Sequence, residues 1–256
     1  MDLQLKGKAA VVTGATRGIG RAIAELLADE GASVAVCARK PAEVDETVAA
    51  LKAKGVMAWG QPVDIADAAA FRDFIDGAAQ ALGGLDILVS NASALVDGGR
   101  EEAWRAMLDV DVLGAVRAFE VARPHLEAAA ARSGDASFTL ISSVSAAEAS
   151  RISAYGAMKA ALIHFAKGAA RANAARKIRV NVVSPGTVLF EDGVWGEVRR
   201  SQPDLFATMI ERNPTGRMGT PQEIAAAAVF LASPRSAFTT GANLVVDGGI
   251  TQRVNF

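Results

Sequence analysis

Residues 8–29 read KAAVVTGATRGIGRAIAELLAD. The run Lys8–Thr13 is short and apolar, which predicts a buried strand, and Arg21–Asp29 has the composition of a helix that stops near Gly31. The glycine turn between them allows the backbone to approach a pyrophosphate, and the helix behind it offers free N–H groups. Strand, glycine turn and helix in this order are typical of a dinucleotide-binding unit. The spacing is G-x-x-x-G-x-G rather than the commoner G-x-G-x-x-G, so a glycine-rich helix entry without a ligand is the alternative.

The same alternation continues to the end of the chain. Apolar runs predict further strands at 33–38, 56–63, 86–89, 137–141, 178–183 and 243–246. Helices are expected at 43–54, 67–82, 101–131, 154–175 and 221–231. This pattern indicates an α/β protein with a doubly wound parallel sheet, helices on both faces, and one domain over residues 1–256. The broad apolar stripe of 101–131 fits either core packing or contact with another subunit.

Polar and turn-forming residues follow the ends of these predicted strands. They are the glycine turn, Arg39, Asp64, Asn91, the pair Ser142-Ser143 and Pro185-Gly186. Ligands in open parallel sheets bind outside the carboxyl ends of the strands, so we expect these residues to line one edge. That convergence is a stronger indication of a binding site than any single motif.

The end of the second strand bears on the choice of dinucleotide. An acidic residue there would bind the ribose hydroxyls of NAD, whereas this chain has Ala38 followed by Arg39, and Arg17 lies in the glycine turn. Two cations suit the 2′-phosphate of NADP, so the sequence favours NADP(H) and leaves NAD(H) as the alternative. Asp64 has two interpretations: it holds the adenine amino group, or it caps the helix that begins near Asp67.

Tyr155 is the only tyrosine in the chain, and Lys159 follows it by four positions. On a helix these two side chains share a face, and an ammonium beside a phenol favours the ionised phenolate. Such a phenol can give or take a proton at a carbonyl or alcohol oxygen, and a hydroxyl of Ser142 or Ser143 could hydrogen-bond the same oxygen. An ordinary surface pair is the alternative interpretation of Tyr155 and Lys159 taken alone.

The composition limits the kinds of partner, metal site and cellular location that can be expected for this protein. Lys and Arg number 27 against 28 Asp and Glu, which gives no indication of a nucleic-acid or anionic-membrane partner. Cys37 is the single cysteine, and it shares no metal-ligand spacing with His125 or His164, so no disulfide or metal site is expected. No segment resembles a signal peptide or membrane span, and we expect a cytoplasmic protein. Residues 187–220 carry several large apolar side chains in an irregular pattern, which predicts a substrate lid.

The motifs together resemble the short-chain dehydrogenase/reductase family over essentially the whole chain. They are T-G-A-T-R-G-I-G at 13–20, Asp64, S-N-A-S at 90–93, I-S-S at 141–143, Y-G-A-M-K at 155–159, S-P-G at 184–186 and V-D-G-G at 246–249. The resemblance implies a seven-stranded Rossmann sheet, a nicotinamide cofactor and often a homotetramer. The motifs resemble those of bacterial members that act as 3-oxoacyl carrier-protein reductases or as dehydrogenases of sugars, steroids and xenobiotic alcohols.

The resemblance also assigns roles. Tyr155 is the general acid/base, Lys159 assists it and binds the nicotinamide ribose, and Ser143 matches the catalytic serine, although a count of 13 residues before Tyr155 points to Ser142. The expected cofactor residues are Gly14, Thr16, Arg17, Gly18, Ile19, Gly20, Arg39, Asp64, Ile65, Asn91, Ala92, Tyr155, Lys159, Pro185, Gly186 and Val188.

This chain departs from the family pattern at four positions. Asp111 stands where the family has a catalytic-tetrad asparagine that supports a kinked helix and a proton-relay water. Ser90 and Ser93 replace the first asparagine and the glycine of N-N-A-G, and Phe190 replaces a threonine that often contacts the cofactor.

The expected activity is therefore an NADP(H)-dependent hydride transfer between nicotinamide and a small-molecule carbonyl or secondary alcohol, in the manner of a 3-oxoacyl or ketone reductase. An NAD-dependent sugar, steroid or xenobiotic alcohol dehydrogenase is one alternative. A non-catalytic NADP-binding sensor or scaffold is an alternative of a different class, suggested by Asp111 and Phe190.

Overall fold

The computed structural model describes residues 2–149 and 151–254, and its strands form one seven-stranded sheet of order β3-β2-β1-β4-β5-β6-β7. Every neighbouring pair is parallel. The strands are β1 (Ala9–Thr13), β2 (Ser33–Ala38), β3 (Ala58–Pro62), β4 (Ile87–Ser90), β5 (Ala136–Ile141), β6 (Ile178–Pro185) and β7 (Asn243–Val246). The predicted doubly wound sheet is confirmed, and its strand order reverses between β1 and β4, which is where such sheets bind ligands.

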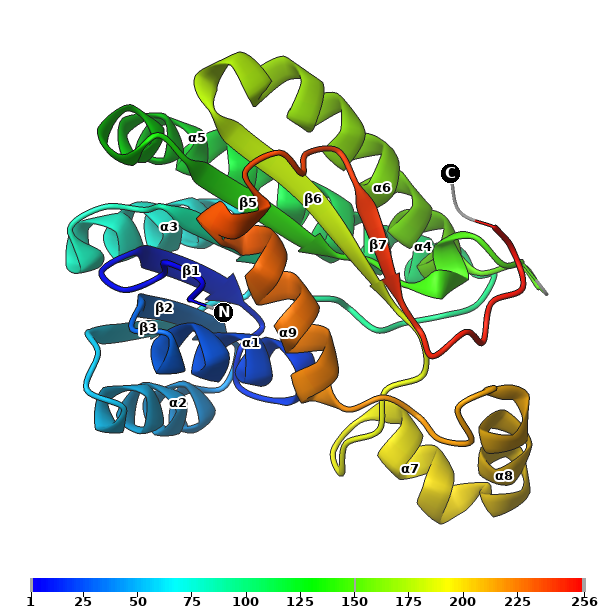
Figure 1. The fold of residues 1–256 in the computed structure, drawn as a ribbon. Helices are drawn as coiled ribbons and strands as arrows, with labels where there is room; N and C mark the ends of the chain where they lie inside the picture. The colour runs from blue at the N-terminus through cyan, green and yellow to red at the C-terminus, as the bar shows by residue number, and fades with distance from the viewer. Residues whose placement is uncertain (1, 150, 255–256) are drawn as a thin grey trace.

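Helices cover both faces of the sheet (Figure 1). One layer contains α1 (Gly18–Asp29), α2 (Pro41–Ala53) and α9 (Pro221–Ala232), and the other contains α3 (Ala68–Leu82), α5 (Leu113–Ser133) and α6 (Ala154–Asn173). Successive strand residues point to opposite faces, so Val11 packs in one apolar cluster while Ala10 and Val12 pack in the other. The short strands are buried on both faces because each face has its own core.

The segment 101–131, expected to be helical throughout, is helical but contains an irregular turn. It consists of α4 (Glu101–Met107), a π-helical turn η1 (Leu108–Val112) and α5. A π-turn inserts one extra residue into the helical register, which locally re-aims side chains and is frequent at functional sites. Here the turn carries Asp111, which is buried although Asp109 beside it is exposed.

The segment 187–220 is more regular than its sequence pattern suggested. It holds two helices, α7 (Val194–Ser201) and α8 (Pro203–Arg212), which protrude beyond the sheet as the yellow and gold part of Figure 1. Pro203 takes the first turn of α8, where its missing N–H has no intrahelical partner to lose. Each of these two helices is short, so its apolar residues do not repeat over enough turns to show a helical period in the sequence.

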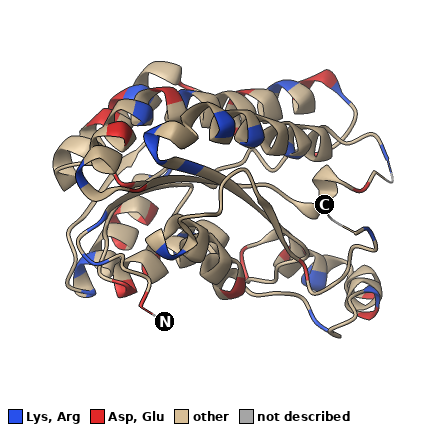
Figure 2. Cartoon of the chain, turned by 45° about the horizontal axis from the view of Figure 1, so that its top comes forward, with Lys and Arg blue, Asp and Glu red and all other residues tan. Residues whose placement is uncertain are grey.

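Figure 2 shows positions of Lys or Arg and positions of Asp or Glu interspersed along the ribbon of the outer helices. In that view, neither kind of residue is confined to one layer of helices. Among the described residues, no helix combines the length and apolar character needed to cross a membrane. The expected cytoplasmic location stays a prediction.

Candidate active site

The glycine turn connects β1 to α1 at the edge formed by the strand ends. Gly14 and Gly18 have φ of +63° and +54°, and a Cβ on Gly14 would lie 2.9 Å from the Cα of Ala92. Helix α1 begins with neither a side-chain cap nor an acidic residue in its first turn. Its first N–H groups and positive dipole end are therefore available to an anion, so the turn fits a dinucleotide pyrophosphate.

Asn91 fastens this turn to the neighbouring strand. Its side-chain amide donates to the carbonyl oxygens of Thr13 (3.1 Å) and Gly14 (2.9 Å). The backbone N–H groups of Asn91 and Ala92 both donate to the Thr13 hydroxyl. Asn91 thus stabilises the conformation of the glycine turn through hydrogen bonds to its carbonyl oxygens. Thr13 was not predicted as a site residue, although a polar residue ending an apolar strand was a usable signal.

A second residue that sequence reasoning missed is Glu43, in the first turn of α2. Its carboxylate accepts hydrogen bonds from Lys40 (2.7 Å) and from the Thr16 hydroxyl (3.1 Å). The hydrogen bond from Lys40, the bond from Thr16 and the charge of Arg17 hold the pKa of Glu43 below its ordinary value, against a smaller opposing effect of burial. Arg39 lies exposed on the same connection. The expected cationic site for a 2′-phosphate therefore contains an ionised carboxylate as well.

Arg17 makes its direct contact elsewhere. Its guanidinium donates to the carbonyl oxygen of Asp192 at 2.7 Å, which ties the glycine turn to the start of the protruding segment. The Phe190 ring lies over the same turn, and a Cβ on Gly18 would be 2.6 Å from it. An aromatic ring thus covers the N-terminus of α1, at the position where a threonine often stands in the family that the sequence resembles.

Asp64 and Ile65 follow β3 with different environments. Asp64 is exposed, and its carboxylate accepts from the N–H of Ala66 at 3.0 Å. The alternative that Asp64 caps the following helix is wrong, because the cap of α3 is Asp67, which accepts from the N–H groups of Ala69 and Ala70. Ile65 is buried against Gly114 of α5.

The two serines after β5 have distinct roles. The Ser142 hydroxyl is buried and donates to the carbonyl oxygen of Lys159 at 2.8 Å, which joins β5 to α6. The Ser143 hydroxyl accepts from the N–H of Ser145 at 3.1 Å, and its own hydrogen is left to donate. This difference favours Ser143 as the serine that contacts a substrate.

Tyr155 and Lys159 lie in the first two turns of α6. Ser153 caps this helix by accepting from the N–H of Gly156, so both side chains are held on a well-formed turn. The Lys159 ammonium is 5.6 Å from the centroid of the Tyr155 ring and donates to the carbonyl oxygen of Ile141 at 3.0 Å. The two side chains lie side by side as the sequence predicted. Among the described residues, the Tyr155 hydroxyl has no hydrogen-bond partner.

Asp111 brings an anion to this pair. One carboxylate oxygen lies 2.9 Å from the Lys159 ammonium, and the other accepts from the N–H of Ala94 at 2.9 Å. The side chains of Asp111 and Lys159 are 0% and 3% exposed. The π-turn therefore directs a carboxylate into the site and ties it to the loop that follows β4.

The last strand ends complete the edge. β6 ends at Pro185, and a Cβ on Gly186 would lie 2.7 Å from the Cβ of Asp247, so only glycine fits beside the V-D-G-G turn. Val188 is buried and bridges to Gly219, which anchors both ends of the protruding segment. The structure thus brings the predicted residues that follow these strands to the edge of the sheet where the strands have their carboxyl ends.

Comparison with known proteins agrees with this arrangement. A family profile described as enoyl-(acyl carrier protein) reductase matches residues 14–251. Isoepoxydon dehydrogenase of Penicillium expansum is 35% identical over 251 residues, covering 96% of this chain and 95% of the relative. The chain belongs to the short-chain dehydrogenase/reductase family. It is accordingly an NAD(P)-dependent oxidoreductase.

Solved members of the short-chain dehydrogenase/reductase family superpose over nearly the whole chain. L-Sorbose reductase from Gluconobacter frateurii, complexed with NADPH and L-sorbose, is 31% identical with a TM-score of 0.89 and covers 99% of this chain and 100% of its own. A 7α-hydroxysteroid dehydrogenase complexed with NADH and 7-oxoglycochenodeoxycholic acid is 30% identical with a TM-score of 0.89, at coverages of 99% and 98%. Nicotinamide cofactor binding is therefore supported, and both cofactor types occur among the neighbours.

Proposed function

We propose that this protein interconverts a ketone and a secondary alcohol with NADP(H). The observation that carries the proposal is that Tyr155 and Lys159 lie together on α6, which packs against the end of β5 and the turn that begins at Ser143. A bound nicotinamide supplies the hydride. The residues of this chain supply the proton and orient the reacting oxygen.

The arrangement of side chains assigns each a task. Ser143 and Tyr155 donate hydrogen bonds to the carbonyl oxygen, and the Tyr155 proton passes to that oxygen as negative charge develops on it. Lys159 stabilises the phenolate that remains, because its ammonium stands beside the ring. Hydride on carbon and proton on oxygen together convert C=O to CH–OH, and the reverse steps oxidise the alcohol.

The preference for NADP(H) rests on Arg39 and Lys40, which follow β2, and on Arg17 within the glycine turn, although the Arg17 guanidinium donates to the carbonyl oxygen of Asp192 in this structure. Glu43 opposes them with a single carboxylate. We therefore propose NADP(H) as the main cofactor and NAD(H) as the weaker one. Fluorescence titration of the purified protein with NADPH and NADH tests this, and tighter binding of NADH would refute it.

Apolar side chains are exposed on three segments that adjoin site residues. Leu95, Val96, Ile152 and Val194 are all exposed, by 53%, 41%, 73% and 58%. Leu95 follows the residue that binds Asp111, Ile152 lies against Gly99 near the α6 cap, and Val194 begins α7. Exposed apolar side chains on segments next to polar site residues favour an apolar ketone, cyclic or acyl-type, over a sugar.

The Tyr155→Phe variant tests the mechanism. It removes only the hydroxyl, so turnover should fall by about 10²-fold or more while the affinity for NADPH changes little. Retention of most turnover would refute the role of Tyr155. Cofactor binding without turnover of any ketone or alcohol by the wild-type protein would instead favour the sensor alternative.

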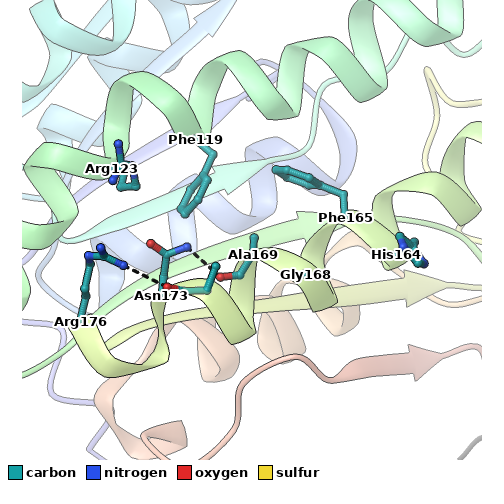
Figure 3. Close-up of a pocket in the computed structure, with 9 residues that line it drawn as sticks. Phe119, Arg123, His164, Phe165, Gly168, Ala169, Asn173 and Arg176 are labelled. Atoms are coloured by element: carbon teal, nitrogen blue, oxygen red, sulfur yellow. Dashed lines mark hydrogen bonds between the residues drawn. The ribbon is translucent and has the colours of Figure 1, made fainter.

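We also propose that the protein forms a homotetramer through α5 and α6. An open groove of about 470 Å³ lies between these helices (Figure 3), with Phe119 and Phe165 on its walls and open space beside Gly168. A second copy of the chain would bury this partly apolar groove. The Gly168→Arg variant should lower the mass measured by light scattering, and an unchanged mass would refute this interface.

A further inference from the structure

The buried pair formed by Asp111 and Lys159 has a consequence for Tyr155. Asp111 reaches Lys159 from the π-turn, at 2.9 Å between its Oδ1 and the ammonium nitrogen. Both side chains are almost completely buried, so solvent screens their charges weakly. The Lys159 ammonium also stands over the phenol ring, at 5.6 Å from the ring centroid.

The contact between the two groups is a charge pairing more than a hydrogen bond. Among the described residues, Oδ1 of Asp111 receives no hydrogen bond of acceptable geometry, whereas Oδ2 receives the N–H of Ala94. The Lys159 ammonium instead directs a hydrogen bond to the carbonyl oxygen of Ile141. Asp111 is thus held in place by the backbone of another loop, with its free oxygen turned to the cation.

We infer that Asp111 is a positioning residue that sets the pH at which Tyr155 ionises, by neutralising much of the field of Lys159. This inference rests on the proposed role of Tyr155. A cation favours the phenolate, and an anion placed next to that cation opposes it. Tyr155 therefore keeps its proton to a higher pH than it would beside an uncompensated lysine. A phenol that is protonated over a wider pH range is suited to act as the acid, which favours carbonyl reduction as the direction of the reaction.

Other charged groups around α6 are placed differently. On the elements packed against it, the carboxylates of Glu102 and Asp109 are exposed, and three ion pairs are present: Glu101 with Arg105, Arg176 with Glu127, and Arg179 with Asp135. In the loops beside the start of α6, Asp97 pairs with Arg151. The 3₁₀ turn η2 (Val144–Ala146) has no ionisable side chain. Within the described residues, Asp111 is therefore the carboxylate that acts on Lys159 directly.

The sequence allows a direct measurement, because Tyr155 is the only tyrosine in the chain. The near-ultraviolet absorbance of the phenolate, recorded against pH on the cofactor-free protein, reports Tyr155 alone. Asp111→Asn keeps the shape and the acceptor for Ala94 but removes the charge. Its titration midpoint should lie about one pH unit below that of the wild type, since removal of the anion leaves the cation uncompensated.

Asp109→Asn is the matched control, because it removes the same charge from an exposed position of the same π-turn. Its midpoint should stay within about 0.3 pH unit of the wild type, as expected for a screened surface charge. Far-ultraviolet circular dichroism at each pH establishes that every variant is folded. Should Asp111→Asn not fold, Asp111→Ser removes the same charge and must lower the midpoint likewise.

An unchanged or higher midpoint in the Asp111 variants overturns the inference. The rate profile gives a second readout: the loss of reduction rate at alkaline pH should begin about one unit lower in Asp111→Asn, because the acid form of Tyr155 is lost earlier. A lowered midpoint without turnover of any ketone would refute the proposed function and leave the electrostatic coupling intact. Turnover of a ketone together with an unmoved midpoint would support the proposed function and refute the electrostatic coupling.

Discussion

Arg179 offers a stringent test of how the fold holds the site. It lies in β6 with 5% of its side chain exposed, and its guanidinium forms two hydrogen bonds to the Asp135 carboxylate, at 2.7 and 3.0 Å. The same group donates to the carbonyl oxygens of Leu231, Ala232 and Ser233 at the end of α9. One side chain thus joins the strand that ends at Pro185 to the helix packed across it.

We predict that Arg179→Met lowers the free energy of unfolding by about 3 kcal/mol, because it leaves a largely buried carboxylate and several carbonyl oxygens without their donor. For a chain of this size that corresponds to a fall in Tm of roughly 6–12 °C. The pair Arg72 and Glu120 provides the control, since its side chains are 47% and 56% exposed. Arg72→Met should cost less than about 1 kcal/mol.

Urea denaturation followed by circular dichroism measures both variants, with thermal melting as a second assay. The double variant Arg179→Met, Asp135→Leu removes both charges and should recover part of the loss, because no unpaired ion remains buried. A loss below about 1 kcal/mol in the single variant, or no recovery in the double variant, would show that the Arg179 network is not what joins β6 to α9.

Three further predictions concern the site. Glu43→Gln should improve binding of NADPH relative to NADH by about 3- to 10-fold in fluorescence titrations, because it removes one anion from beside the expected 2′-phosphate; an equal effect on both cofactors would contradict this. Phe190→Thr should tighten NADPH binding by at least about 3-fold, since the ring covers the N-terminus of α1 and must move for a phosphate to enter; weaker binding would mean that the ring belongs to the bound site. Burial raises the pKa of Asp97, but hydrogen bonds from Ser153 and Arg151 outweigh it and lower the pKa from 3.8 to about 2. The stability from Asp97 should therefore be complete above pH about 4 and be lost as the pH falls towards 2, and Asp97→Asn should show a smaller acid-induced decrease in Tm over that interval.

The sequence was sufficient for the fold class and for the edge of the sheet on which the site lies. Glycine at positions of positive φ, apolar runs of strand length and a proline at the start of a helix are local signals, and each was present at Gly14, Ala9–Thr13 and Pro221. The pairing of Tyr155 with Lys159 was equally accessible, because the spacing of four residues on a helix fixes their shared face. Parallel strands have their carboxyl ends at the same edge of the sheet, so the residues that follow those ends lie near one another.

Tertiary structure decided the contacts between residues far apart in the chain. Asp111 meets Lys159 only because a π-turn rotates it inward. The family resemblance implied a kink near Asp111, but no local pattern in Leu108–Val112 predicts the direction of its carboxylate. The choice between Ser142 and Ser143 depends on which hydroxyl reaches α6, and the carboxylate of Glu43 approaches Thr16 only when α2 packs beside the glycine turn. Sequence periodicity sets which face of an element is buried, whereas the partner it meets there is set by how whole elements pack, and the charge balance around Tyr155 depends on that second step.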